Sequence, residues 1–230
     1  MIKVIGFIRR KDGLSLAEFS DYWLRVHSPL IAAVPGMRRY VQSHVVPEAL
    51  DRYEPPFDGI ALSWFDDVAA WEAAKASDAW LRAVDDAANF IGGGASLMAT
   101  EVPIIEDGRR ARERESMIKY AGLLTRLDGW AIGDFQAHWR DLHGPLVKAE
   151  FTTMVRYIQN HPLPETYVSG SPPAYDGVPE AWFESLETLP WSMVRRPDGP
   201  RTTSAGQDSA TIFRQPIPCM VVKDVVIVDS

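Results

Sequence analysis

Two histidines and two tyrosines have residue types and a spacing that suit acid–base chemistry. His27 is followed by Tyr40, and His143 is followed by Tyr157 at nearly the same separation. An imidazole has an unperturbed pKa near 6.5, so its neutral form can accept a proton at about pH 7. A phenol beside it can donate a hydrogen bond to the oxyanion that develops. Such a pair predicts enolisation, decarboxylation or dehydration of a small molecule.

The two pairs arise because the chain is duplicated. The stretch 3–44 returns as 119–161 at a nearly constant offset, with slips that fall in connecting segments. An internal repeat of this length predicts two structural units. We place the first unit at residues 1–107, a linker at 108–116 and the second unit at 117–230.

The histidine of each copy falls on the apolar face of a predicted helix. Residues 2–10 predict a strand, and Ser15 then opens a capping box with Glu18 that should start the helix. Spacings of three and four residues put His27 on one stripe with Leu16, Phe19, Trp23 and Leu30. Because Pro29 removes a backbone donor, the helix should kink or restart close to His27.

The remaining elements predict an α+β fold. Strands over 37–46, 57–65 and 96–105, with one or two helices over 69–90, complete a βαββαβ unit in which Gly92-Gly93-Gly94 forms a turn. This order is the ferredoxin-like split βαβ arrangement. Two such units can pack sheet against sheet and form an α/β barrel of the dimeric type inside one chain.

The second unit departs from this order in its later half. Residues 190–218 are rich in Pro, Gly, Ser and Thr, and a short helix around 204–213 takes the place of the longer helical stretch. Residues 217–228 close the unit as a strand. This difference leaves open which half is active.

The strand after each helix carries three polar residues on one face, because strand side chains alternate with a period of two. They are Tyr40, Gln42 and His44 in the first copy and Tyr157, Gln159 and His161 in the second. If this face looks at the helix, a base, a phenol and further polar groups converge in an apolar pocket. The same face could instead look into the barrel.

Composition excludes several classes of function. A net charge of −7 and a pI near 5.3 argue against a nucleic-acid surface, which would be basic. No apolar stretch approaches the roughly 18 residues of a membrane span. Cys219 is the single cysteine, so no disulfide forms within the chain and a reducing, cytoplasmic location is expected. A homodimer stays open, because fusion of the units can satisfy the sheet contact internally.

The motif D-G-x-S-x-x-E-F-x-x-Y-W-x-x-x-H-x-P-L, followed by R-Y-x-Q-x-H, resembles the EthD family of the dimeric α/β-barrel superfamily. The resemblance extends over about four fifths of the chain and includes both copies. It implies a buried histidine and tyrosine that act on an aromatic or enolisable small molecule without a metal or cofactor. By this resemblance His27 and His143 match the family histidine, and Tyr40 and Tyr157 match the strand tyrosine.

These observations define the expected site. We expect the histidines of the helices to act as bases, with the strand residues positioning the substrate and donating hydrogen bonds. The expected catalytic residues are His27, Tyr40, His44, His143, Tyr157 and His161, and the expected substrate-binding residues are Trp23, Gln42, Trp139 and Gln159. His138 and His143 lie five residues apart and should not share a helix face, so no metal site is expected.

The first hypothesis is a cofactor-independent lyase or isomerase that acts on a small aromatic or enolisable metabolite. The alternatives are an oxidoreductase, such as a cofactor-free monooxygenase or an accessory protein of ether degradation, and a non-catalytic protein that binds a small molecule. Oxygen consumption separates the oxidoreductase from the lyase. A filled core at the histidines would favour the binding protein.

Overall fold

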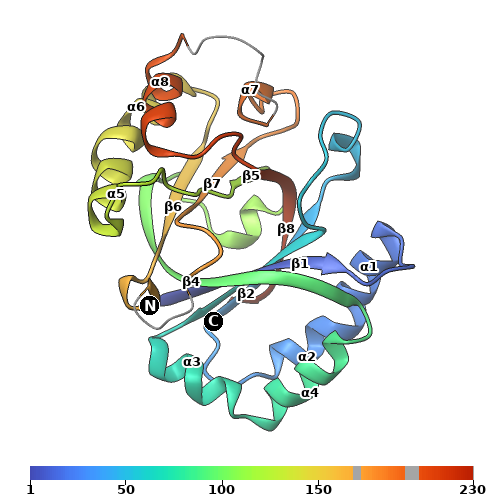
Figure 1. Cartoon of the computed structure of the whole chain (residues 1–230). Helices are drawn as coiled ribbons and strands as arrows, with labels where there is room; N and C mark the ends of the chain where they lie inside the picture. The colour runs from blue at the N-terminus through green and yellow to red at the C-terminus, as the bar shows by residue number, and fades with distance from the viewer. Residues whose placement is uncertain (168–171, 195–201, 230) are drawn as a thin grey trace.

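The strands of both units join into one closed antiparallel barrel (Figure 1). The computed structural model describes residues 1–167, 172–194 and 202–229, and within them eight strands follow the order β1-β3-β2-β8-β5-β7-β6-β4. The strands are β1 (Ile2–Arg10), β2 (Arg39–Val45), β3 (Gly59–Phe65), β4 (Ile91–Ile105), β5 (Ile118–Gly122), β6 (Arg156–Pro162), β7 (Val178–Phe183) and β8 (Cys219–Asp229).

Each unit contributes a four-stranded ferredoxin-like sheet whose edges meet the edges of the other sheet. Within the units the orders are β4-β1-β3-β2 and β8-β5-β7-β6. β2 pairs with β8, and β4 pairs with β6. An isolated sheet would leave two edges with unpaired backbone groups, and closure removes them. The predicted α+β fold of two tandem units in one intramolecular barrel is confirmed.

Helices cover the outside of the barrel, those of the first unit on one side and those of the second on the opposite side (Figure 1). The first unit has α1 (Leu16–Tyr22), η1 (Trp23–His27), α2 (Ser28–Ala32), η2 (Pro47–Ala49), α3 (Val68–Lys75) and α4 (Asp78–Ala87). Then follow η3 (Ala111–Arg114), α5 (Ile132–His138), η4 (Trp139–His143), α6 (Gly144–Glu150), η5 (Pro164–Tyr167), α7 (Trp191–Val194) and α8 (Ser204–Ile212). No helix of the described residues has the length and apolarity that crossing a membrane requires.

The glycine triplet is part of β4 and does not form the predicted turn. Gly93 pairs with Arg9 and Gly94 with Ile8 along β1. A Cβ atom on Gly94 would lie 2.1 Å from the carbonyl oxygen of Phe7, so a side chain there would force the two strands apart. The triplet therefore permits close strand contact, which is a second common use of glycine in sheets.

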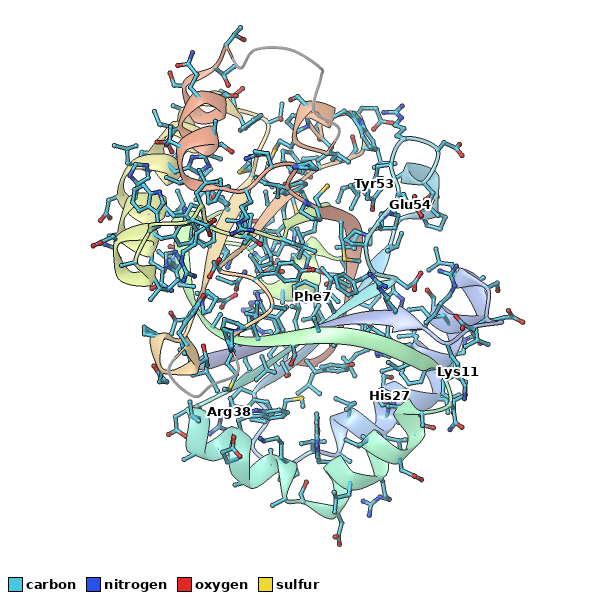
Figure 2. The ribbon with its side chains drawn as sticks, viewed as in Figure 1. Phe7, Lys11, His27, Arg38, Tyr53 and Glu54 are labelled. Carbon is cyan, nitrogen blue, oxygen red and sulfur yellow. The ribbon has the colours of Figure 1, made fainter. Side chains whose placement is uncertain are left out.

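The interior of the barrel combines an apolar core with a buried charge network. Phe7 lies in this core, as Figure 2 shows. Glu180 of β7 forms ion pairs with both Lys3 and Lys119, the equivalent lysines of the two units, and all three side chains are buried. Lys119 also contacts Asp224 at 2.6 Å. One carboxylate thus connects β1 of the first unit to β5 of the second.

Burial alone would raise the pKa of Glu180, but Lys119 and Lys3 hold it well below its usual range. A carboxyl group whose pKa is depressed in the folded state stabilises that state above its ordinary pKa. This contribution is lost as the pH falls through the depressed value.

Replacing Glu180 by Gln should lower the free energy of unfolding by about 3–5 kcal/mol, because the substitution leaves buried lysines without their shared counter-charge. Urea unfolding at neutral pH measures this loss. Glu184→Gln is the matched control, since Glu184 pairs with Arg109 at the exposed surface, and its unfolding midpoint should barely move. Equal stability of the two variants would show that the interior network is not what holds the units together.

Candidate active site

A π-helical turn carries the histidine in both copies. η1 runs from Trp23 to His27, and η4 runs from Trp139 to His143. In each turn the residue after the histidine donates its backbone N–H to the tryptophan carbonyl, five residues earlier. The proline that follows has no N–H to donate, so the chain leaves the regular α-helical pattern at this point. The irregularity predicted near His27 is confirmed, and it has the form of a widened turn.

The polar face of each second strand looks at this helix and away from the barrel interior. Gln42 Nε2 donates to the carbonyl oxygen of Trp23 at 3.0 Å, and Trp23 Nε1 donates to Tyr40 Oη at 3.2 Å. In the second copy Gln159 Nε2 donates to the carbonyl oxygen of Trp139 at 2.8 Å. These bonds settle the orientation that the strand pattern left open. The glutamines tie the strand to the widened turn.

His44 and His161 pack against the rings of the two helix tryptophans, Trp23 and Trp139. The His44 ring lies 4.7 Å from that of Trp23, and His161 stacks on Trp139 at the same distance. Burial lowers the pKa of each of these histidines to about 4, so both rings are neutral at physiological pH. Each Nε2 contacts the side-chain oxygen of the glutamine two residues before it, at 3.1 and 2.9 Å. The tyrosine, glutamine and histidine of each strand are therefore joined in one series of hydrogen bonds.

Each helix histidine has an aspartate partner that the sequence patterns did not identify. His27 Nδ1 lies 2.8 Å from Asp86 Oδ2, and His143 Nδ1 lies 2.8 Å from Asp208 Oδ2. Asp86 belongs to α4 and Asp208 to α8, the short helix predicted around 204–213. The sequence holds one related pattern, because each aspartate is followed within one or two helical turns by a phenylalanine. In the structure this phenylalanine packs on the histidine. These phenylalanines are Phe90 and Phe213.

The environment keeps both helix histidines neutral. Burial lowers the pKa of His27 and His143, and the facing aspartates offset only part of this effect. A ring nitrogen that faces a carboxylate carries the hydrogen, so Nδ1 is the donor and Nε2 keeps a lone pair. Within the described residues no hydrogen bond reaches Nε2 of His143. This nitrogen is therefore placed to accept a proton.

The cavity that a base requires lies in the second unit. Its volume is about 350 Å³, and its walls include Trp139, His143, Glu150, Tyr157 and Phe213. This size is within the range of small-molecule sites. Burial raises the pKa of Tyr157 to about 12, so its hydroxyl is protonated at physiological pH. His143 and Tyr157 thus meet at one hollow, as the repeat predicted for each half.

In the first unit the strand tyrosine is buried among apolar side chains. Tyr40 lies in one apolar cluster with Ile31, Phe65 and Trp71, the last of which comes from α3. Figure 2 shows His27 on the side of the barrel that α4 covers. In the second unit Ser192 and Met193 of α7 line the cavity, whereas in the first unit Trp71 of α3 belongs to the cluster around Tyr40.

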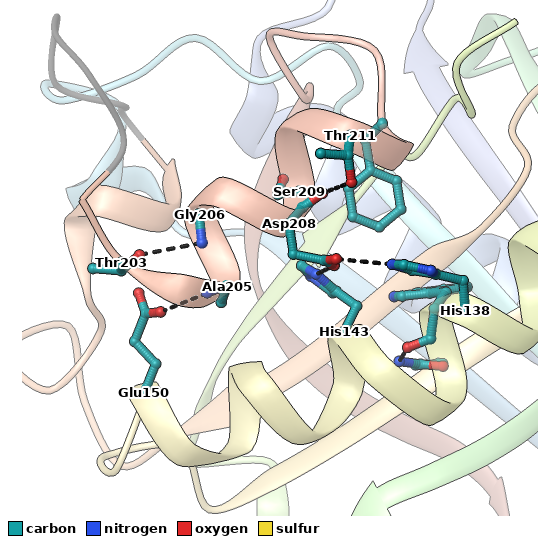
Figure 3. Close-up of polar contacts among 12 residues, drawn as sticks. His138, His143, Glu150, Thr203, Ala205, Gly206, Asp208, Ser209 and Thr211 are labelled. Atoms are coloured by element: carbon teal, nitrogen blue, oxygen red, sulfur yellow. Dashed lines mark hydrogen bonds and ion pairs between the residues drawn. The ribbon is translucent and has the colours of Figure 1, made fainter.

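The expectation that His138 and His143 do not share a helix face is wrong. His138 Nε2 lies 2.8 Å from Asp208 Oδ1, while His143 Nδ1 contacts Oδ2 of the same carboxylate (Figure 3). Five residues span too much rotation in an α-helix, but a π-helical turn closes i to i+5 and brings them into line. Within the described residues no group of three or more His, Cys, Asp or Glu side chains is arranged to hold a metal ion.

Comparison with known proteins agrees with this architecture. The EthD domain model matches residues 11–94 and 128–211, which together are most of the chain. An uncharacterized 11.0 kDa protein in the thcB-thcC intergenic region of Rhodococcus erythropolis is 28% identical over 85 residues, which are 37% of this chain and 81% of that protein.

Two solved structures share the whole fold at low identity. An anthrone oxidase-like protein has a TM-score of 0.66 at 8% identity and covers 97% of this chain and 91% of its own. A candidate monooxygenase from Lactobacillus acidophilus has a TM-score of 0.54 at 9% identity and covers 100% of this chain and 96% of its own. At these identities the similarity is one of fold. The two domain matches show that this chain belongs to the EthD family and contains two copies of its domain.

Proposed function

We propose that the second unit is a cofactor-independent acid–base catalyst, in which His143 Nε2 removes a proton from a small aromatic or enolisable molecule. The observation that carries this proposal is the 2.8 Å contact between His143 Nδ1 and Asp208 at the wall of a cavity of about 350 Å³. The carboxylate holds the ring in the tautomer that leaves Nε2 basic. It also stabilises the imidazolium that forms after proton transfer.

Tyr157 supplies the matching acid in this mechanism. Gln159 Nε2 donates to Tyr157 Oη at 3.4 Å, so the phenolic hydrogen is left to point at an acceptor in the cavity. A protonated phenol can stabilise the enolate oxygen that develops when the substrate loses its proton. Aromatic walls from Trp139 and Phe213 suit a flat substrate.

The fate of the proton defines the reaction class. Return of the proton to another carbon is isomerisation, and loss of a leaving group from the enolate is a lyase reaction. Both require a base and an oxyanion donor and no redox group. A lyase or isomerase is therefore the first assignment.

Oxygenation is the second candidate, and the fold neighbours favour it. They include proteins named as anthrone oxidase-like and as a monooxygenase candidate. An enolate of an electron-rich aromatic can pass electrons directly to dioxygen, which would be the second substrate. The same His143 would perform the first step, so oxygen uptake distinguishes the two assignments.

The His143→Ala variant should exchange the carbon-bound protons of an enolisable probe at least about 100-fold more slowly than the wild type, since a positioned base contributes 10²–10⁴ in rate. Anthrone and simple aryl ketones are suitable probes. Deuterium incorporation in D₂O under argon, followed by NMR, measures the exchange. His27→Ala is the matched control and should stay within about threefold of the wild type, because the cavity lies in the second unit. Loss of exchange in His27→Ala alone would place the reaction in the first unit and contradict the proposal.

The pKa of His143 should fall further below its ordinary value in Asp208→Asn. The carboxylate raises this pKa against the effect of burial, so removing the charge leaves burial unopposed. NMR titration of the imidazole signals measures the change. The His27 signal in the same spectrum is the internal control, since its partner is Asp86. An unchanged His143 signal would mean that Asp208 does not control the base.

A further inference from the structure

We propose that His138 is a positioning residue of the second unit: by donating its Nε2 hydrogen to Asp208 Oδ1, it orients the carboxylate so that Oδ2 faces His143. This inference rests on the function proposed for His143. It assigns a role to a histidine that the sequence patterns set aside. The argument depends on the π-helical turn, on the sharing of one carboxylate and on a counterpart in the first unit.

The π-helical turn η4 makes the shared contact geometrically accessible. His138 ends α5 and His143 ends η4, and the i to i+5 spacing brings both rings to one side of the helix. Figure 3 shows the two imidazoles meeting the carboxylate of Asp208 from the same helix. A regular α-helix would direct the two rings differently.

Each ring occupies a different oxygen of the carboxylate. His138 Nε2 lies 2.8 Å from Oδ1, and His143 Nδ1 lies 2.8 Å from Oδ2. A carboxylate held through one oxygen can still rotate about its last bond, whereas contacts on both oxygens fix its plane. The Asp208 side chain is 11% exposed and His138 is 24% exposed, so His138 occupies the solvent-facing side of the pair.

Packing fixes the His138 ring in turn. Trp130 meets His138 edge to face with ring centroids 5.1 Å apart. Trp130 Nε1 donates to the carbonyl oxygen of Thr211, three residues after Asp208 on α8. Trp130, which precedes α5, therefore contacts both His138 at the end of α5 and α8, the helix that carries Asp208.

In the first unit a different residue type donates a hydrogen bond to the aspartate. Tyr22 occupies the position of His138 in the repeat, and its hydroxyl donates to Asp86 Oδ1 at 2.7 Å while His27 takes Oδ2. A donor to the outer carboxylate oxygen is thus present in both copies, although the residue type differs. This correspondence points to hydrogen-bond donation as the shared property.

The test compares His138→Tyr with His138→Phe in the full chain. Tyrosine restores a donor like that of Tyr22, whereas phenylalanine has nearly the same size and no donor. With the enolisable probe, kcat of His138→Phe should fall roughly 10- to 100-fold with little change in KM, because the base loses its alignment. His138→Tyr should stay within about threefold of the wild type. Tyr22→Phe is the matched control in the first unit and should leave kcat unchanged.

A second measurement does not depend on turnover. The Nδ1 proton of His143 should give a sharp, slowly exchanging NMR signal in the wild type and in His138→Tyr, and a broadened, rapidly exchanging signal in His138→Phe. Sharp signals in all three proteins would overturn the positioning role, even if His143 proves to be the base. Equal loss of kcat in both variants would also overturn it, because the imidazole itself would then be required. Sharp signals in the wild type with no exchange of any probe would count against the proposed function alone.

Discussion

The closure of two sheets through their edges is the constraint on which the rest of this structure depends. A four-stranded ferredoxin-like sheet has open edges at β2 and β4, or at β6 and β8, and each edge is paired with the other unit. Because the strands form one wall, the helices must lie outside it. Side chains of both units then line the interior. There Glu180 forms ion pairs with Lys3 of the first unit and Lys119 of the second.

The proline after each histidine has consequences beyond a kink. It converts the preceding residues into a π-helical turn, which places the histidine against an aspartate from a distant helix. The tryptophan carbonyl that closes the turn also accepts a hydrogen bond from the strand glutamine. In the second unit the same turn brings His138 to Asp208. One local irregularity thus organises contacts with the neighbouring strand and with a distant helix.

Duplication has produced two copies of the same hydrogen-bonded framework with different surroundings. The histidine–aspartate contact has the same length in both units, so this contact does not depend on a cavity. In the first unit the strand tyrosine lies in one apolar cluster with Trp71, and in the second a cavity lies beside the equivalent tyrosine. The half whose later sequence departs from the repeat is the half in which the helix histidine and the strand tyrosine line a common cavity. Residues of α7 line the second-unit cavity, whereas in the first unit Trp71 of α3 belongs to the apolar cluster that includes Tyr40.

The sequence by itself determined the duplicated units, the order of strands and helices, the capped start at Ser15 and the irregularity near His27, because each depends on local periodicity or on a missing backbone donor. It also grouped Tyr40, Gln42 and His44 on one strand face. Only the tertiary structure decided that this face meets the helix and that the glycine triplet lies within β4. The aspartate partners, the role of His138 and the cavity at His143 were decided there as well. These features depend on packing between elements far apart in the chain, which a repeat or a hydrophobic period does not encode.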